Sequence, residues 1–230
     1  EEDIFRSIAE MKKNIDECNV LMISGGFSAG DEPDGSGKFI ANVLNNKDIA
    51  DSVHALLDRG GLILGICNGF QALVKSGLLP YGRLGQVTKD SPTLFLNDIN
   101  RHISQIVTTR VGTTNSPWLS GFAVGDLHTI AVSHGEGKFV VNEELAKELF
   151  ANGQVAFQYV DPLEEEPTME SPYNPNGSYY AIEGIISKNG QILGKMGHTE
   201  RYEGNLFKNI IDEGLEQPLF DNAVAYFRGE

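Results

Sequence analysis

Residues 61–69 read GLILGICNG, an apolar run that ends with Cys67 between two glycines, Gly65 and Gly69. Such a run is typical of a strand that is buried on both faces of a parallel sheet. Residues 68–75 continue with helical spacing and stop before a glycine and a proline. Glycines two positions before and after a nucleophile are the signature of a nucleophile elbow, a sharp turn from strand to helix. The sequence therefore predicts an α/β fold with Cys67 in that turn.

The first half of the chain alternates between helical and strand patterns around this turn. Residues 4–16 carry apolar side chains at helical spacing, residues 19–24 (NVLMIS) form a second buried run, and residues 39–59 return to helical spacing. This alternation predicts βαβ units, whose right-handed crossovers give a mostly parallel sheet flanked by helices.

The second half predicts shorter strands joined by turns. These are residues 104–111, 127–132, 138–141 and 154–160, followed by a hairpin of residues 182–187 and 191–196 around Asn189-Gly190. The acidic segment 161–178 is expected to be an exposed loop, and residues 204–214 a closing helix. No repeat or linker is visible, so residues 1–230 are interpreted as one domain with extra antiparallel strands in its second half.

Composition argues against several classes of partner. The 230 residues carry a formal net charge of −14, with a pI of about 4.7. A surface of this sign repels nucleic-acid phosphates and anionic membranes. No apolar run approaches the ~18–20 residues of a membrane helix, and no signal peptide is visible. Two cysteines, Cys18 and Cys67, make no disulfide framework, so a reducing cytoplasm is expected.

The elbow gives Cys67 the surroundings of a nucleophile. It would lie at a helix N-terminus, where backbone N–H groups and the helix dipole favour a thiolate. The N–H of Asn68 would point at a developing oxyanion. The alternative is a buried structural cysteine in a tight turn, which is the usual role of a lone cysteine in an apolar run.

A cysteine nucleophile needs a base, and two histidines are candidates. His198-Thr199-Glu200 follows a predicted strand, and in extended backbone His198 and Glu200 would lie on the same face. Glu200 could then orient the imidazole toward the sulfur. His134 lies in a glycine-rich turn, SHGEG, and spacing alone leaves it open as the base.

Three further features of the sequence concern ligand binding. Gly25-Gly26, directly after the run 19–24, lets backbone N–H groups approach a ligand and could supply a second oxyanion donor, although an ordinary βα loop is as good an interpretation. Residues 35–38 (GSGK) lack the spacing of a phosphate-binding loop, and no cysteine–histidine cluster has zinc spacing. ATP and metal sites are therefore not supported in this chain.

Four motifs occur in the order GGFSAGD (25–31), GICNGFQ (65–71), SHGEG (133–137) and GHTER (197–201). In this order they resemble the class I (triad) glutamine amidotransferases, most closely the glutaminase domains of phosphoribosylformylglycinamidine synthases. The resemblance implies a flavodoxin-like sheet and a Cys67–His198–Glu200 triad that hydrolyses glutamine. It also implies oxyanion N–H groups on Gly26 or Phe27 and on Asn68. The residues implied to contact glutamine or line the interface are Ser28, Gln71, Ser133, His134, Gly135 and Glu136.

The same resemblance implies a partner. Ammonia would pass to a synthetase domain that makes formylglycinamidine ribonucleotide and that holds ATP and Mg²⁺, with no cofactor in this chain. Two departures stand out. Many members have prolines beside the catalytic histidine, where this chain has Gly197 and Thr199. The family domain also begins with a strand and a G-T-N segment that this chain lacks. The chain is therefore interpreted as an excerpt of a longer synthase, with an incomplete sheet or a separate glutaminase subunit as the alternatives.

Two other functions remain open from the sequence. A thiol hydrolase acting on other substrates is disfavoured, because α/β-hydrolases place the acid before the histidine in the chain. A catalytically degenerate domain that only supports a synthetase is disfavoured because all three triad residue types are present.

Overall fold

The structure is a computed structural model that describes residues 2–26, 37–204, 206–207, 210 and 216–230. Its helices are α1 (Glu2–Glu17), α2 (Lys38–Leu44), α3 (Lys47–Asp58), α4 (Asn68–Ser76), α5 (Leu78–Tyr81), α6 (Glu143–Ala151) and α7 (Leu219–Arg228), with 3-10 turns η1 (Pro117–Leu119), η2 (Tyr179–Ala181) and η3 (Thr199–Arg201). Its strands are β1 (Val20–Ile23), β2 (Leu62–Ile66), β3 (Thr93–Phe95), β4 (Ile103–Val111), β5 (Leu127–His134), β6 (Lys138–Val140), β7 (Val155–Tyr159), β8 (Ile182–Ile186) and β9 (Ile192–Lys195).

The described strands form a seven-stranded sheet in the order β1-β2-β9-β8-β7-β4-β5, and β3 pairs with β6 separately. This confirms the α/β class, but the sheet is mixed and not mostly parallel. The pairs β1–β2 and β2–β9 are parallel. The remaining pairs, β9–β8, β8–β7, β7–β4 and β4–β5, are antiparallel. The turn at Asn189-Gly190 makes β8 and β9 an antiparallel hairpin, and β9 pairs in parallel with β2 on its other side.

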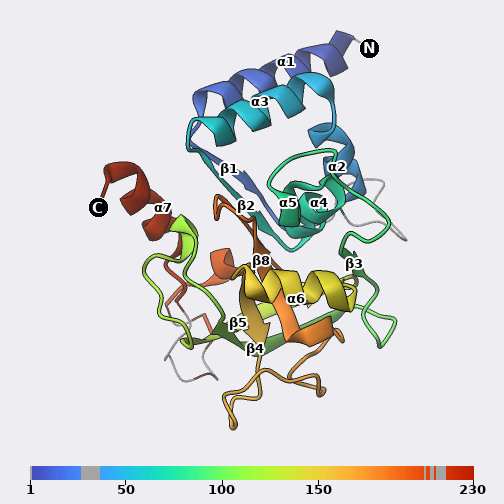
Figure 1. Ribbon diagram of the computed structural model, residues 1–230, viewed down its shortest axis with the longest axis vertical. Helices are drawn as coiled ribbons and strands as arrows, with labels where there is room; N and C mark the ends of the chain where they lie inside the picture. Colours follow the sequence, from blue (N-terminus) through green and yellow to red (C-terminus); the bar gives the residue numbers. More distant parts are fainter. Residues whose placement is uncertain (1, 27–36, 205, 208–209, 211–215) are drawn as a thin grey trace.

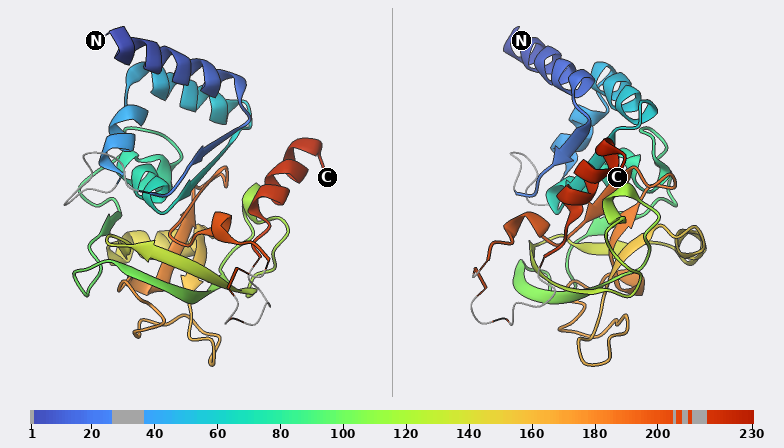
Figure 2. Two further views of the ribbon diagram at one scale, coloured as in Figure 1. Left: turned by 180° about the vertical axis from the view of Figure 1, so that it is seen from behind. Right: turned by 90° about the vertical axis from the view of Figure 1, so that its left-hand side faces the viewer.

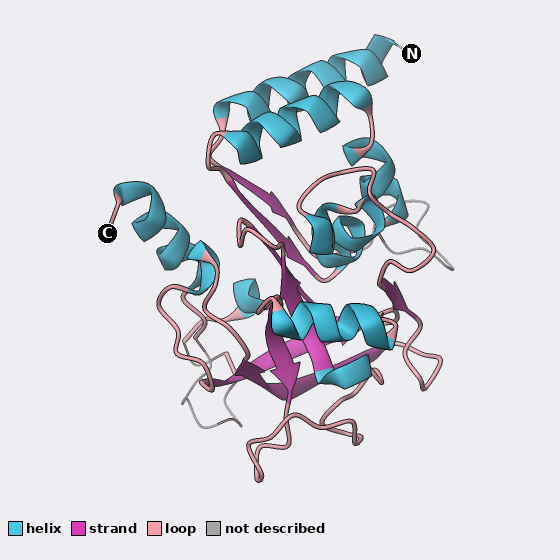
Figure 3. Cartoon of the chain, viewed as in Figure 1, coloured by secondary structure: helices cyan, strands magenta, loops and turns pink. Residues whose placement is uncertain are grey.

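The two ends of the sheet are covered differently. Helices α1 and α3 lie side by side beyond β1 and β2, while β4 and β5 lie at the opposite end of the molecule (Figures 1 and 2). Helices gather around the parallel end, and strands and loops dominate the antiparallel end (Figure 3). Strands β2, β8 and β9 are buried along their whole length. They therefore form the rigid centre of the core, and Cys67 directly follows one of them.

Polar caps explain where the structure departs from the sequence patterns. Residues 39–59 form two helices because the Asn46 side chain accepts a hydrogen bond from the Asp48 N–H and begins α3 anew. Helix α6 was not predicted, although Asn142 caps it by accepting from the Leu145 N–H.

The predicted helix at 204–214 is wrong for residues 204, 206, 207 and 210, and its other residues lie outside the described ones. The closing helix is α7, further along the chain.

The described residues lack two features. None of their helices combines the length and apolarity that crossing a bilayer requires. They also contain no group of three or more histidine, cysteine, aspartate or glutamate side chains arranged to hold a metal ion.

Candidate active site

Cys67 occupies a strained turn between β2 and α4. Its φ of 53° and ψ of −106° are unusual for a residue with a side chain. The glycines on both sides are needed for close packing. A Cβ at Gly69 would lie 1.9 Å from the Ile23 carbonyl oxygen, and one at Gly65 would lie 2.8 Å from the Gly69 backbone. The predicted nucleophile elbow is therefore present, with both glycines explained by backbone contacts.

The Cys67 thiol is buried, with 6% of the residue exposed. Burial raises its pKa to about 11, although the backbone N–H groups of Asn68 and Gly26 oppose the shift. The helix N-terminus was predicted to favour the thiolate, which would lower the Cys67 pKa. The net shift is upward instead, because desolvation outweighs the local dipoles. In the resting structure Sγ donates a hydrogen bond to the Ser133 carbonyl oxygen at 3.6 Å. The thiol must therefore be deprotonated by a neighbour during reaction.

His198 and Glu200 are paired as predicted: His198 Nδ1 lies 2.6 Å from Glu200 Oε1. The route differs from the expected extended strand, because Thr199–Arg201 form the turn η3, which brings the two side chains together. Burial raises the Glu200 pKa, but the hydrogen bond from His198 and the charges of His198 and Lys195 outweigh it, and the net shift is downward. Glu200 therefore stays ionised and fixes Nδ1 of His198 as a donor.

The other nitrogen of His198 is available for chemistry. Nε2 is buried and has no hydrogen-bond partner among the described residues. A Cβ at Gly25 would lie 2.8 Å from His198 Cε1 and 3.2 Å from Cys67 Cβ, so Gly25 leaves the room in which imidazole and thiol approach each other. Nε2 and Sγ are not hydrogen-bonded in this state, as is common in unliganded active sites.

A small cavity of about 50 Å³ joins these groups. It is lined by Gly26, Cys67, Gln71, Ser133, His134, Gly135, His198 and Arg201. The structure thus brings together residues from all four quoted motifs. Of the other predicted site residues, Asn68 points its N–H at the thiol, and the Glu136 carbonyl accepts from Gln71 Nε2. Phe27 and Ser28 lie outside the described residues.

His134 is unsuited to be the base. Burial, with smaller contributions from the charges of His102 and His198, lowers its pKa to about 3. Its Nδ1 lies 3.1 Å from Asn97 Oδ1, which also accepts from the Gly137 N–H, so Nδ1 is the donor and Nε2 the acceptor. His134 is therefore a neutral part of the cavity wall, and the geometry favours His198 over it as a base.

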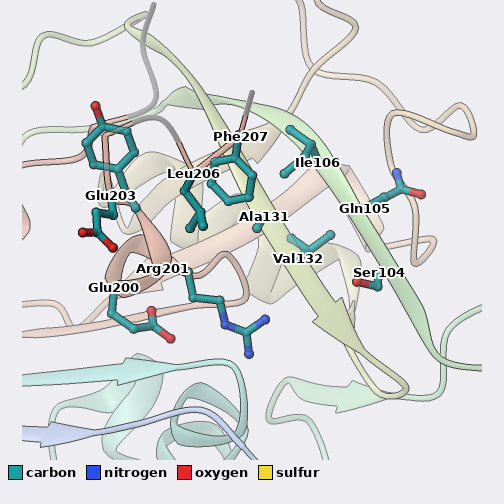
Figure 4. Close-up of a pocket in the computed structure, with 11 residues that line it drawn as sticks. Ser104, Gln105, Ile106, Ala131, Val132, Glu200, Arg201, Glu203, Leu206 and Phe207 are labelled. Atoms are coloured by element: carbon teal, nitrogen blue, oxygen red, sulfur yellow. The ribbon is translucent and has the colours of Figure 1, made fainter. Parts of the chain in front are cut away.

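Sequence reasoning missed Arg201, Asn97 and the conformational role of Gly25. Arg201 lines the small cavity, and its charge lowers the pKa of Cys67 against the effect of burial. Its place in the GHTER motif was the sequence signal that could have identified it. Arg201 also borders a larger, open cavity of about 850 Å³ (Figure 4). Its walls are β4 and β5 residues and residues 200–203, 206 and 207. Arg201 thus lines both cavities, whereas Glu200 lines the larger one alone of the two.

Comparisons with known proteins agree with this geometry. Residues 1–227 match the model of the CobB/CobQ-like glutamine amidotransferase domain. The chain is 34% identical to phosphoribosylformylglycinamidine synthase subunit PurQ of Methanococcus maripaludis, over 94% of this chain and 83% of that protein. It is also 34% identical to the PurQ subunit of Gloeobacter violaceus, over 96% and 87%.

Among solved structures, PurLQS from Thermotoga maritima is similar, with a TM-score of 0.66 and 26% identity over 92% of this chain and 81% of that one. The glutaminase domain of Trypanosoma brucei CTPS with bound acivicin has a TM-score of 0.55 at 12% identity, covering 96% and 75%, and shows the shared fold alone. The chain therefore belongs to the CobB/CobQ-like glutamine amidotransferases, in the group that contains the PurQ subunits of phosphoribosylformylglycinamidine synthase.

Proposed function

We propose that this chain hydrolyses glutamine through a Cys67 thioester and passes the ammonia to a synthetase that makes formylglycinamidine ribonucleotide in purine biosynthesis. The observation that carries the proposal is the convergence of the elbow thiol, the His198–Glu200 pair and two backbone N–H groups on one small cavity. We place the reaction in the cytoplasm, in keeping with two free cysteines.

Each group has a step to perform. His198 Nε2 takes the Sγ proton as the sulfur attacks the side-chain amide carbon of glutamine. The N–H groups of Asn68 and Gly26 stabilise the oxyanion that forms. His198 then protonates the departing nitrogen, and ammonia leaves. His198 Nε2 then deprotonates a water molecule, which attacks the thioester. Glutamate leaves, and the Cys67 sulfur regains its proton from His198. Glu200 stabilises the imidazolium in both halves of the cycle.

The cavity wall suits glutamine as substrate. Gln71 Oε1 and His134 Nε2 are buried acceptors without a hydrogen-bond partner among the described residues. A buried acceptor left unpaired costs about 1–3 kcal/mol, so a ligand that supplies donors is favoured. Glutamine brings an amide NH₂ and an α-ammonium group, and we assign Gln71, Ser133, His134, Gly135 and Glu136 to its binding.

The partner is a synthetase subunit or domain. The Thermotoga maritima relative is described as a PurLQS assembly, and by analogy this chain would act beside a synthetase that holds ATP and Mg²⁺. By the same analogy we assign the metal to the partner. Residues 1–230 would form the glutaminase domain.

The test is glutamine hydrolysis by the chain, alone and with its synthetase. We expect Cys67→Ala and His198→Ala each to lower turnover by about 10³-fold or more, because each removes the nucleophile or its only base. Cys18→Ala is the matched control, since its half-buried thiol only donates to the Ile15 carbonyl and lies outside the cavity.

A glutamine-mimicking electrophile provides a second readout. It should alkylate Cys67 far faster than Cys18 in the wild type and lose that selectivity in His198→Ala. Hydrolysis of simple esters but not of glutamine, or equally slow labelling of both cysteines, would contradict the proposal.

A further inference from the structure

A buried ion pair lies directly before the His198 turn. Lys195 on β9 and Glu183 on β8 are both fully buried, with Nζ 3.8 Å from Oε1. Burying two charges is expensive, and replacing such a pair with apolar side chains is often neutral or stabilising. Stability alone therefore does not account for the pair, and its contacts indicate what it does.

The contacts of the pair converge on the residues either side of His198. Glu183 Oε1 accepts a hydrogen bond from the Gly197 N–H. Lys195 Nζ donates to the Gly197 carbonyl oxygen and to Thr199 Oγ1, each at 3.2 Å. His198 is thus bracketed by hydrogen bonds before and after it in the chain.

Gln217 completes this network from the segment before α7. Its Oε1 accepts from Lys195 Nζ at 2.8 Å and from Thr199 Oγ1 at 2.7 Å. The three N–H donors of an ammonium group match three acceptors, on Gly197, Thr199 and Gln217. The geometry of the His198 turn therefore depends on groups from β8, β9 and the C-terminal segment.

Gly197 explains why such a network is needed. Glycine restrains the backbone least of all residues. At Gly197 the Glu183 carboxylate occupies the space that a side chain would need, since a Cβ there would lie 2.9 Å from Glu183 Oε1. On the other side the His198 N–H donates to the Ala131 carbonyl oxygen at 2.9 Å. A general base must be held within about 0.5 Å of its productive position, which a free glycine hinge would not ensure.

We propose that Lys195, Glu183 and Gln217 are positioning residues that hold His198 in line with Cys67. The inference rests on the proposed function for its catalytic consequence. The ion pair also influences Glu200, the carboxylate that orients His198. The charge of Lys195 is among those that lower the Glu200 pKa against the effect of burial.

The test compares two double variants that both remove the buried charges. Glu183→Leu with Lys195→Met leaves the Gly197 N–H without an acceptor, whereas Glu183→Gln with Lys195→Met keeps an amide oxygen there. In the complex with synthetase, we expect the Leu/Met variant to lower kcat for glutamine about tenfold or more with KM within about twofold, because only the base moves. The Gln/Met variant should regain the part of kcat that depends on an acceptor for the Gly197 N–H, and its kcat should stay below that of the wild type because Lys195 is still absent. Both should keep the wild-type Tm within a few degrees.

A spectroscopic readout is independent of activity. The His198 Nδ1 proton, shared with Glu200 at 2.6 Å, should give a sharp downfield NMR signal in the wild type. We expect it to broaden or vanish in the Leu/Met variant and to return in part in the Gln/Met variant, which lacks Lys195 but keeps an acceptor for the Gly197 N–H. Lys147→Met, in an exposed pair with Glu143, is the control that should change nothing.

The outcomes separate the two claims. An unchanged kcat and an unchanged His198 signal in the Leu/Met variant would overturn the inference. A wild type without glutaminase activity would count against the proposed function, while the NMR signal would still decide the positioning role. Should the Leu/Met variant not fold, Thr199→Val removes only the hydroxyl between Lys195 and Gln217, and the same loss of signal and kcat is expected.

Discussion

Burial and reactivity oppose each other at Cys67. The elbow directs two N–H groups at the sulfur, yet desolvation is stronger and keeps the thiol protonated at neutral pH. Ionisation is thereby reserved for the moment when His198 can accept the proton. A resting thiolate would be exposed to oxidation and alkylation, so a buried thiol beside an unpartnered imidazole nitrogen is the safer arrangement.

The raised pKa of Cys67 has a consequence for stability. An unfolded thiol loses its proton near pH 9.0, whereas the folded one keeps it up to about 11. The stabilisation is complete below pH 9 and is lost as pH rises through 11. Between pH 8 and 10.5 we expect the free energy of unfolding of the wild type to fall about 2 kcal/mol more than that of Cys67→Ala.

Urea unfolding at both pH values measures this difference. Cys18→Ala should follow the wild type. Parallel curves for the wild type and Cys67→Ala would show that the thiol is not desolvated as the structure indicates.

At the residue scale the sequence predicted the triad types and the elbow, because both are local patterns. It did not predict the direction of the Cys67 pKa, because desolvation depends on what surrounds the thiol in three dimensions. The choice between His134 and His198 depended on a resemblance. The Asn97 contact and the burial of His134 argue against His134 as the base.

At the scale of elements, the β2–α4 turn is fixed by how closely it approaches β1. A Cβ at Gly69 would enter the Ile23 carbonyl, which is backbone and cannot rotate away. We expect Gly69→Ala to destabilise the protein by about 3 kcal/mol or more, or to prevent folding, because β1 and α4 would have to separate.

Thermal unfolding of Gly69→Ala tests this packing. Gly204→Ala is the matched control, because a Cβ there would meet no atom within 4 Å and its stability should be unchanged. Equal melting temperatures for the two variants would show that β1 and α4 do not pack as described.

Elements with strong apolar periodicity were predictable, and those fixed by caps or by tertiary contacts were not. The buried run at β2 and the hairpin of β8 and β9 matched the prediction. The run at 19–24 does form strand β1, but its predicted burial on both faces is wrong: only Ile23 is buried, because β1 lies at the edge of the described sheet. The pairing of β9 with β2 was not predictable, because no local pattern specifies which distant strand joins a parallel edge. That pairing is what carries His198 to Cys67.

At the scale of the whole molecule, the catalytic groups sit between regions of very different burial. Strands β2 and β9, which precede Cys67 and the His198 turn, are buried throughout, whereas in α1 only Ile15 is buried. Helix α7 buries Leu219 and Ala223, and Asn222 Nδ2 donates to the Trp118 carbonyl oxygen at 2.9 Å. The C-terminal segment that supplies Gln217 is therefore anchored better than the N-terminal helix.

Hydrogen exchange should follow this gradient. Amides in β2, β8 and β9 should exchange slowest. Their free energy of opening should be close to that of global unfolding, because they open only when the core is lost. Amides of α1 should exchange fastest among the long helices, and those of α7 at an intermediate rate. Mass-spectrometric exchange on the intact chain measures all three. Protection in α1 equal to that in β2 would mean that the N-terminal helix belongs to the same cooperative unit as the site, and the active-site scaffold would then extend further than the burial of its residues indicates.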